Sequence, residues 1–151
     1  MKTETDTLLD ALVAQGCRLR NIDGFVLLSL PDDDSEFVYE RMGGWLYLGT
    51  TFMTPEEFED SQYEGELNRF LLELQHRNLG CRFSYDSAGF LTIGGELDPD
   101  RQLPEDVLQM LEQILFIIES CIHLCDEVLD TGQLPSDREV DEAFGVNENL
   151  H

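Results

Sequence analysis

Cys121, His123 and Cys125 form the densest group of reactive side chains in the sequence, within "ESCIHLC". Thiolates and imidazoles are the ligands that zinc prefers, and closely spaced cysteines also carry out redox chemistry. The segment lies in a long apolar stretch that predicts a helix. On one continuous helix, His123 points about 200° away from Cys121. The three side chains therefore cannot bind one metal ion together.

A structural zinc site needs four ligands in a near-tetrahedral arrangement. The remaining cysteines, Cys17 and Cys81, are far apart in the sequence. We therefore interpret Cys121 and Cys125 as small core residues, a common role of free cysteine. We expect no metal and no cofactor. A thiol or metal protein built on the four cysteines is kept as an alternative.

Other catalytic motifs are missing. The sequence has no Gly-Lys-Ser/Thr phosphate loop and no Gly-x-Ser-x-Gly turn, and "IGGELD" is a glycine pair rather than a dinucleotide fingerprint. Asp98, Asp100 and Asp106 resemble the start of a calcium loop. However, Leu103 occupies the position that requires glycine, and Gln109 the position that requires glutamate. We therefore expect a protein that is not an enzyme.

The charge of the chain is extreme. Its 151 residues include 32 acidic and 9 basic ones, which gives a formal net charge of −23. Such a surface repels phosphate backbones and anionic lipids, so neither nucleic acid nor membrane is an expected partner. With 42% apolar residues, the chain should still build a core. We expect an acidic, cytoplasmic protein, because no signal peptide and no membrane span are recognisable.

The elements that position these residues follow from hydrophobic periodicity, capping signals and turn residues. Thr54-Pro55-Glu56-Glu57 predicts the start of a helix, because it combines a capping box with proline at the first helical position. Gly43-Gly44 between two β-rich runs predicts a hairpin. The predicted elements are a helix over 3–15, strands in 25–30, 36–42 and 45–52, a helix from Thr54 to 78–80 with a break near Gly65, strands in 81–86 and 90–95, and a helix from Pro104 to about 131.

This order, α-β-β-β-α-β-β-α, predicts an α+β fold with an antiparallel sheet and helices packed on one side. We expect one domain over residues 1–132. Residues 133–151 are predicted to be an acidic, loosely ordered tail with one short helix. If Val140 and Phe144 anchor this tail, its deletion should lower the stability of the protein.

The helix that begins at Pro104 carries two apolar stripes. One contains Val107, Leu111, Ile114, Ile118, Cys121, Cys125 and Val128, and the other contains Leu108, Leu115, Ile122 and Leu129. Together they are wider than the apolar face of an ordinary surface helix. One layer of the domain covers one face, so the second stripe predicts a further partner.

The chain resembles the class I chaperones of type III secretion and the related YbjN-type proteins of bacteria over about residues 5–130. The resemblance lies in "LLDALVAQG" followed by "NIDGFVLLSL", then "LNRFLLELQHRNLGCRFSYDSAGFLTIGG", then the long apolar helix. These families share a pattern of apolar positions and turns rather than an invariant motif. The small size and the strong acidity also fit them.

The resemblance implies a homodimer that binds an extended segment of a client protein, with no catalysis. The implied client-binding residues are Leu8, Leu12, Phe25, Leu27, Val38 and Leu46, and the implied dimer interface contains Leu67, Phe70, Leu71 and Leu74. For each of these residues, a place in the ordinary core is the competing interpretation.

Three other functions stay open. The first is a stress-related regulatory adaptor of the same fold without a role in secretion. The second is the thiol or metal protein described above. The third is an acidic decoy that occupies a basic groove of another protein, whose affinity would fall steeply with salt.

Overall fold

The structure is a computed structural model that describes residues 6–145 except 78, 99 and 102. Its strands form one six-stranded sheet in the order β1-β2-β3-β4-β6-β5. The chain divides into two compact units, which share β4, β6 and α4. The first unit is Met1–Thr50 with Gly94–Gln113, and the second is Thr51–Ile93 with Ile114–His151. The units meet after residues 50, 93 and 113, and none of these positions is the predicted domain boundary at residue 132.

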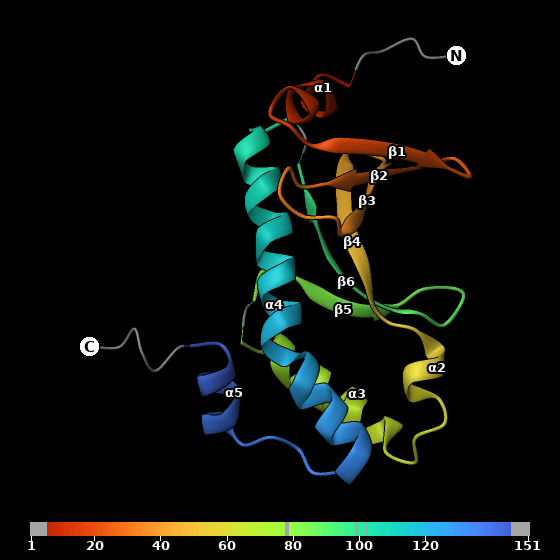
Figure 1. The fold of residues 1–151 in the computed structure, drawn as a ribbon, viewed down its shortest axis with the longest axis vertical. Helices are drawn as coiled ribbons and strands as arrows, with labels where there is room; N and C mark the ends of the chain where they lie inside the picture. The colour runs from red at the N-terminus through yellow and green to blue at the C-terminus, as the bar shows by residue number, and fades with distance from the viewer. Residues whose placement is uncertain (1–5, 78, 99, 102, 146–151) are drawn as a thin grey trace. The chain divides into compact units, whose positions relative to one another are not determined.

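The first unit contains helix α1 and a meander of four strands (Figure 1). The bounds are α1 Thr7–Ala14, β1 Arg18–Ile22, β2 Phe25–Ser29, β3 Glu36–Met42 and β4 Trp45–Met53, with β6 Leu91–Leu97 and the start of α4 Pro104–Thr131. Neighbouring strands of the meander pair antiparallel. The α+β fold with an antiparallel sheet and packed helices is therefore confirmed.

Two tight turns fix the register of the meander. Met42 pairs with Trp45 across Gly43-Gly44, so the predicted hairpin forms where the glycine pair indicated. Ile22 pairs with Phe25 across Asp23-Gly24, whose φ angles are +50° and +85°. An Asp-Gly pair in this conformation matches the twist of a two-residue hairpin. The element order from the sequence lacked β1, because its pattern, RLRNI, is polar and wholly exposed.

The second unit contains α2 Pro55–Phe58, α3 Glu64–Gln75, β5 Arg82–Tyr85, the second part of α4, and α5 Asp137–Ala143. The helix predicted from Thr54 onward is broken into α2 and α3. Ser61 lies in the break, donates to the carbonyl of Leu129 at 2.8 Å and accepts from the backbone N–H of Tyr63 at 3.1 Å. The bond to Leu129 ties the break to the end of α4, and the bond from Tyr63 holds Ser61 at the start of α3.

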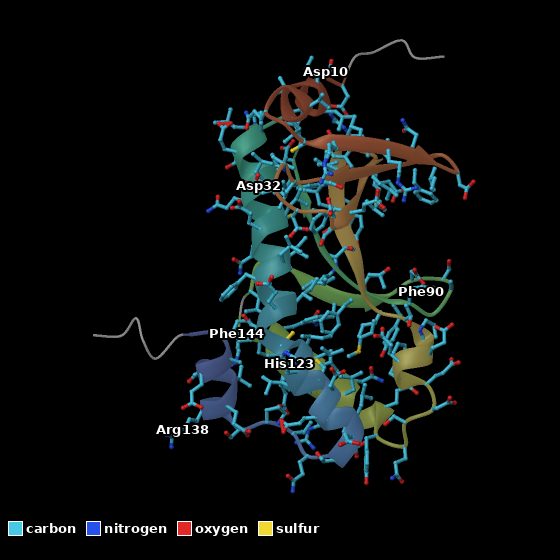
Figure 2. The ribbon with its side chains drawn as sticks, viewed as in Figure 1. Asp10, Asp32, Phe90, His123, Arg138 and Phe144 are labelled. Atoms are coloured by element: carbon cyan, nitrogen blue, oxygen red, sulfur yellow. The ribbon has the colours of Figure 1, made fainter. Side chains whose placement is uncertain are left out.

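The C-terminal segment contributes α5, which begins with a capping box of Ser136 and Glu139. Val140 is buried, and Arg77 forms ion pairs with Asp141 at 2.6 Å and Asp137 at 3.4 Å. The ring of Phe144, labelled in Figure 2, packs edge-on against Phe116 of α4 at a centroid distance of 5.9 Å. Part of the expected tail is thus a helix that contacts α4. Residues 146–151 lie outside the described part.

Replacing Val140 with alanine should loosen α5, because the substitution removes the buried anchor of a short helix. The expected loss of stability is about 1 to 2 kcal/mol. Faster proteolysis within residues 133–145 would report it. Glu142→Ala is the matched control, since that side chain is exposed and, among the described residues, pairs only with Arg138. Equal proteolysis of the two variants would contradict the anchoring role of Val140.

Candidate protein-binding surface

One face of the sheet in the first unit is uncovered. Side chains alternate between the two faces of a strand. Phe37 and Tyr39 of β3 and Leu46 and Leu48 of β4 point to one face and are buried. The register places the alternate residues on the other face, where Leu27 is paired with Val38. We call this surface, made of Ile22, Phe25, Leu27, Val38, Met42 and Trp45, the open face.

Four apolar side chains of the open face are exposed to solvent. The exposed fractions are 41% for Ile22, 48% for Phe25, 51% for Met42 and 55% for Trp45. All four lie at the end of the sheet where the β1–β2 and β3–β4 turns occur, since they form the last pair of each hairpin. A cluster of large apolar side chains that is exposed to solvent marks an interaction site.

The open face ends at an exposed sheet edge. β1 is the first strand in the sheet order and, among the described strands, pairs with β2 alone. Its arginines lie over the neighbouring loop and strand: Arg20 binds Glu36 through two hydrogen bonds of 2.6 and 2.7 Å, and Arg18 donates to the carbonyl of Asp33 at 2.7 Å. An extended peptide can add to such an edge through its backbone.

The structure separates the predicted client-binding residues into two groups. Phe25, Leu27 and Val38 share the open face. Leu8, Leu12 and Leu46 are buried, with exposed fractions of 7%, 0% and 0%.

The sequence interpretation omitted Ile22, Met42 and Trp45. A signal for the last two exists, because each directly flanks the Gly43-Gly44 turn in phase with the outward residues of its strand.

The predicted dimer residues all lie in the core of the second unit. Leu67, Phe70, Leu71 and Leu74 of α3 are at most 4% exposed. Their spacing of three and four residues identifies the covered face of the helix. On the other side of α3, Leu72 is 61% exposed.

A polar network joins α1 to the buried face of the meander. The Asp6 carboxylate caps α1 by accepting from the Leu9 N–H at 3.0 Å. It also accepts from the Tyr39 hydroxyl at 3.0 Å and from the Arg41 guanidinium at 2.9 Å. Burial raises the pKa of Asp6, but the hydrogen bonds from Arg41, Leu9 and Tyr39 outweigh it, so its pKa lies below the usual 3.8. Burial and the Asp6 charge raise the pKa of Tyr39.

Replacing Asp6 with asparagine tests this network. Asparagine caps a helix about as well as aspartate, so the variant removes mainly the charge. We expect a loss of about 1 to 2 kcal/mol at pH 7. Because the folded-state pKa is depressed, the contribution is present above pH 3.8 and is lost as the pH falls through the folded value. Denaturant unfolding of both proteins between pH 7 and pH 2 should show the difference disappear. A difference independent of pH would contradict the ionic role.

The cysteines and histidine of α4 do not converge. Cys121 and Cys125 are fully buried and His123 is exposed. Within the described residues, no group of three or more His, Cys, Asp or Glu side chains is placed to hold a metal ion. The hydrogen bond with Cys121, together with burial, raises the pKa of Cys125. Burial also raises the pKa of Cys81 to about 11. The raised pKa values of Cys125 and Cys81 favour their protonated forms at neutral pH, which disfavours thiolate chemistry at these two residues.

Helix α4 is long and apolar enough, by length and composition, to cross a membrane. The same properties are found in core helices of soluble proteins. Its first stripe is packed: six of the seven predicted residues, from Val107 to Val128, are fully buried, and Ile117 is buried in place of half-buried Ile118. Leu108, Leu115, Ile122 and Leu129 of the second stripe are half-buried.

The fold has a solved counterpart. No protein-family model matches the chain, and no curated protein matches it in sequence. A chain in the solved structure described as "Crystal Structure of the ExsC-ExsE Complex" matches it with a TM-score of 0.53 and 12% sequence identity. The alignment covers 80% of this chain and 92% of that chain. At this identity the similarity shows the fold alone, an α+β arrangement of helices packed on a six-stranded sheet.

Proposed function

We propose that this protein is a non-enzymatic binding protein of the secretion-chaperone kind, which holds an extended segment of a client protein on the open face. The observation that carries the proposal is the group of exposed apolar side chains Ile22, Phe25, Met42 and Trp45 on one uncovered sheet face. Burial of apolar side chains supplies about 25 cal/mol per Å², so a segment laid over these residues would be held mainly by the hydrophobic effect.

The edge strand β1 supports an extended conformation of the client. A client strand beside β1 would gain backbone hydrogen bonds and would place every second side chain over the open face. The similar chain of known structure belongs to a complex of two proteins, ExsC and ExsE, which is consistent with a fold able to hold a protein partner. The acidic surface would keep a protein with an exposed apolar face soluble.

The homodimer is part of the proposal, but Leu67, Phe70, Leu71 and Leu74 are not offered as its interface. A contact on α3 would use the opposite side, around the exposed Leu72. Light scattering of the wild type and of Leu72→Glu would test it. A wild-type protein that is monomeric at all concentrations would exclude the homodimer.

The client decides between two versions of the proposal. A secreted protein would indicate a secretion chaperone, and a regulatory or stress-response protein would indicate an adaptor of the YbjN type. The fold serves either role, because function depends on the site and not on the fold alone. Both versions place the protein in the cytoplasm, which fractionation of the host would test.

The experiment is a pull-down from the native host with three baits. Wild type and Leu103→Asp should recover the same stoichiometric partner, whereas Phe25→Asp should recover less than about a tenth as much. Leu103 is the matched control, because it is an exposed leucine (62%) of the same unit outside the open face. Full recovery by a folded Phe25→Asp bait would refute binding on the open face. Recovery of no partner by the wild type would refute the proposed function.

A further inference from the structure

The open face also carries negative charge at its centre. Glu40 points to this face, because the register pairs it with Tyr47 of β4 and places it beside Phe25 of β2. Its side chain is exposed, and among the described residues it takes part in none of the ion pairs. A carboxylate therefore lies between the apolar residues of the β1–β2 hairpin and those of the β3–β4 hairpin.

A second carboxylate lies on the other side of β4. Met42, Trp45 and Glu96 line a shallow pocket of about 440 Å³. The Tyr47 hydroxyl lies over Gly49 and Gly94, so the tyrosine leans along β4 away from Trp45. This orientation leaves the 55% exposed indole of Trp45 accessible. The pocket thus combines an aromatic ring, a thioether and a carboxylate, with Glu40 one strand away.

Trp45 and Glu40 make a surface suited to a cation. The face of an indole attracts Arg and Lys more strongly than any other aromatic side chain does. A neighbouring carboxylate adds a charge-assisted hydrogen bond to the same group. The net charge of −23 attracts basic segments over a longer range. A purely apolar client would cover the Glu40 carboxylate without offering it a partner, and burying an unpaired charge is unfavourable.

We infer that the pocket of Met42, Trp45 and Glu96, with Glu40 beside it, binds an arginine or lysine side chain of the client segment. This inference rests on the proposed function and adds a requirement on the client: a basic residue flanked by apolar residues that contact Phe25 and Ile22. The apolar contacts hold the segment, and the basic residue sets its register on the sheet.

Trp45 is the only tryptophan, so its fluorescence reports on this pocket directly. The probes are three synthetic peptides of about nine residues, long enough to cross one strand. Each alternates valine and threonine and differs only at its centre, which is arginine, glutamine or glutamate. We expect the arginine peptide to change the Trp45 emission saturably, to bind about tenfold more tightly than the glutamine peptide, and to weaken with salt.

Glu40→Gln should remove most of the preference for the arginine peptide without changing the affinity for the glutamine peptide. Leu103→Asp is the control, because it changes an exposed residue of the same unit outside the open face and should leave the preference for the arginine peptide unchanged. Equal binding of the three peptides would overturn the cation inference. So would an unchanged Trp45 emission with every peptide. In either case a partner recovered in the pull-down through Phe25 would leave the proposed function standing, whereas failure of the pull-down would refute the function itself.

Discussion

Gly94→Ala is expected to lower the free energy of unfolding by about 2 to 3 kcal/mol. Gly94 lies in β6 where the strand passes β4, and a Cβ atom there would be 2.5 Å from the carbonyl oxygen of Leu48 and 2.9 Å from the Cα of Gly49. Both are backbone atoms of a paired strand, so neither moves without disturbing the sheet. The substitution should therefore separate β4 from β6 locally. Chemical denaturation of the purified variant measures the loss.

Gly65→Ala is the matched control, and it should raise the free energy of unfolding instead of lowering it. Gly65 lies in α3 and is exposed, and nothing outside its own stretch of the helix lies within 4 Å of the position that a Cβ atom would take. Alanine in a helix is favoured over glycine by about 1 kcal/mol, so this variant should be more stable than the wild type. If both glycine variants were destabilised alike, the close approach of β4 and β6 would not be the cause.

Phe70→Ala is expected to lower the free energy of unfolding by about 3 to 5 kcal/mol. Phe70 is 2% exposed within a single chain, so truncation leaves a cavity in the core of the second unit. Leu72→Ala, two residues along the same helix, removes a side chain that is 61% exposed in the single chain, so at protein concentrations where the chain is monomeric it should change stability by less than about 0.5 kcal/mol. Denaturation of both variants at several protein concentrations makes the measurement.

The same pair of variants separates the two interpretations of α3. A core role for Phe70 gives a loss of stability that does not depend on protein concentration. A dimer interface on that side would instead make the loss grow with concentration, because dissociation is then part of unfolding. A large effect of Leu72→Ala with a small effect of Phe70→Ala would contradict the burial of the Phe70 side of α3.

The strong periodic and turn signals in the sequence were sufficient for the fold class. The helix predicted from Pro104 to about 131 is α4, and it stops where Gly132 adopts a φ of +77°. The capping signal at Thr54 placed a helix start correctly, and Glu57 accepts from the Thr54 N–H at 2.6 Å. Such signals act within a few residues, so a sequence carries them without its tertiary context.

The surface was harder to predict than the fold. Leu46 of β4 is a leucine like Leu27 of β2, yet Leu46 is fully buried and Leu27 is half-exposed. The difference depends on which face of the sheet is covered, and hydrophobic periodicity alone does not say which side faces the helices. The sequence did not predict the exposure of Trp45 for the same reason, since a tryptophan beside a turn can point inward or outward. Strand β1 was not predicted for a related reason, because an edge strand needs no apolar pattern.

The division of the chain between the two units has a consequence for its synthesis on the ribosome. Each unit is assembled from two separate stretches of sequence, and the first is incomplete without residues 94–113. The strands that bear Phe25 and Trp45 therefore emerge well before the residues of β6 and α4 that complete their sheet and core. Until then the nascent chain exposes apolar surface on both sides of the meander. We expect a ribosome-bound fragment that ends before residue 94 to be protease-sensitive, and resistance to arise only after α4 has left the exit tunnel.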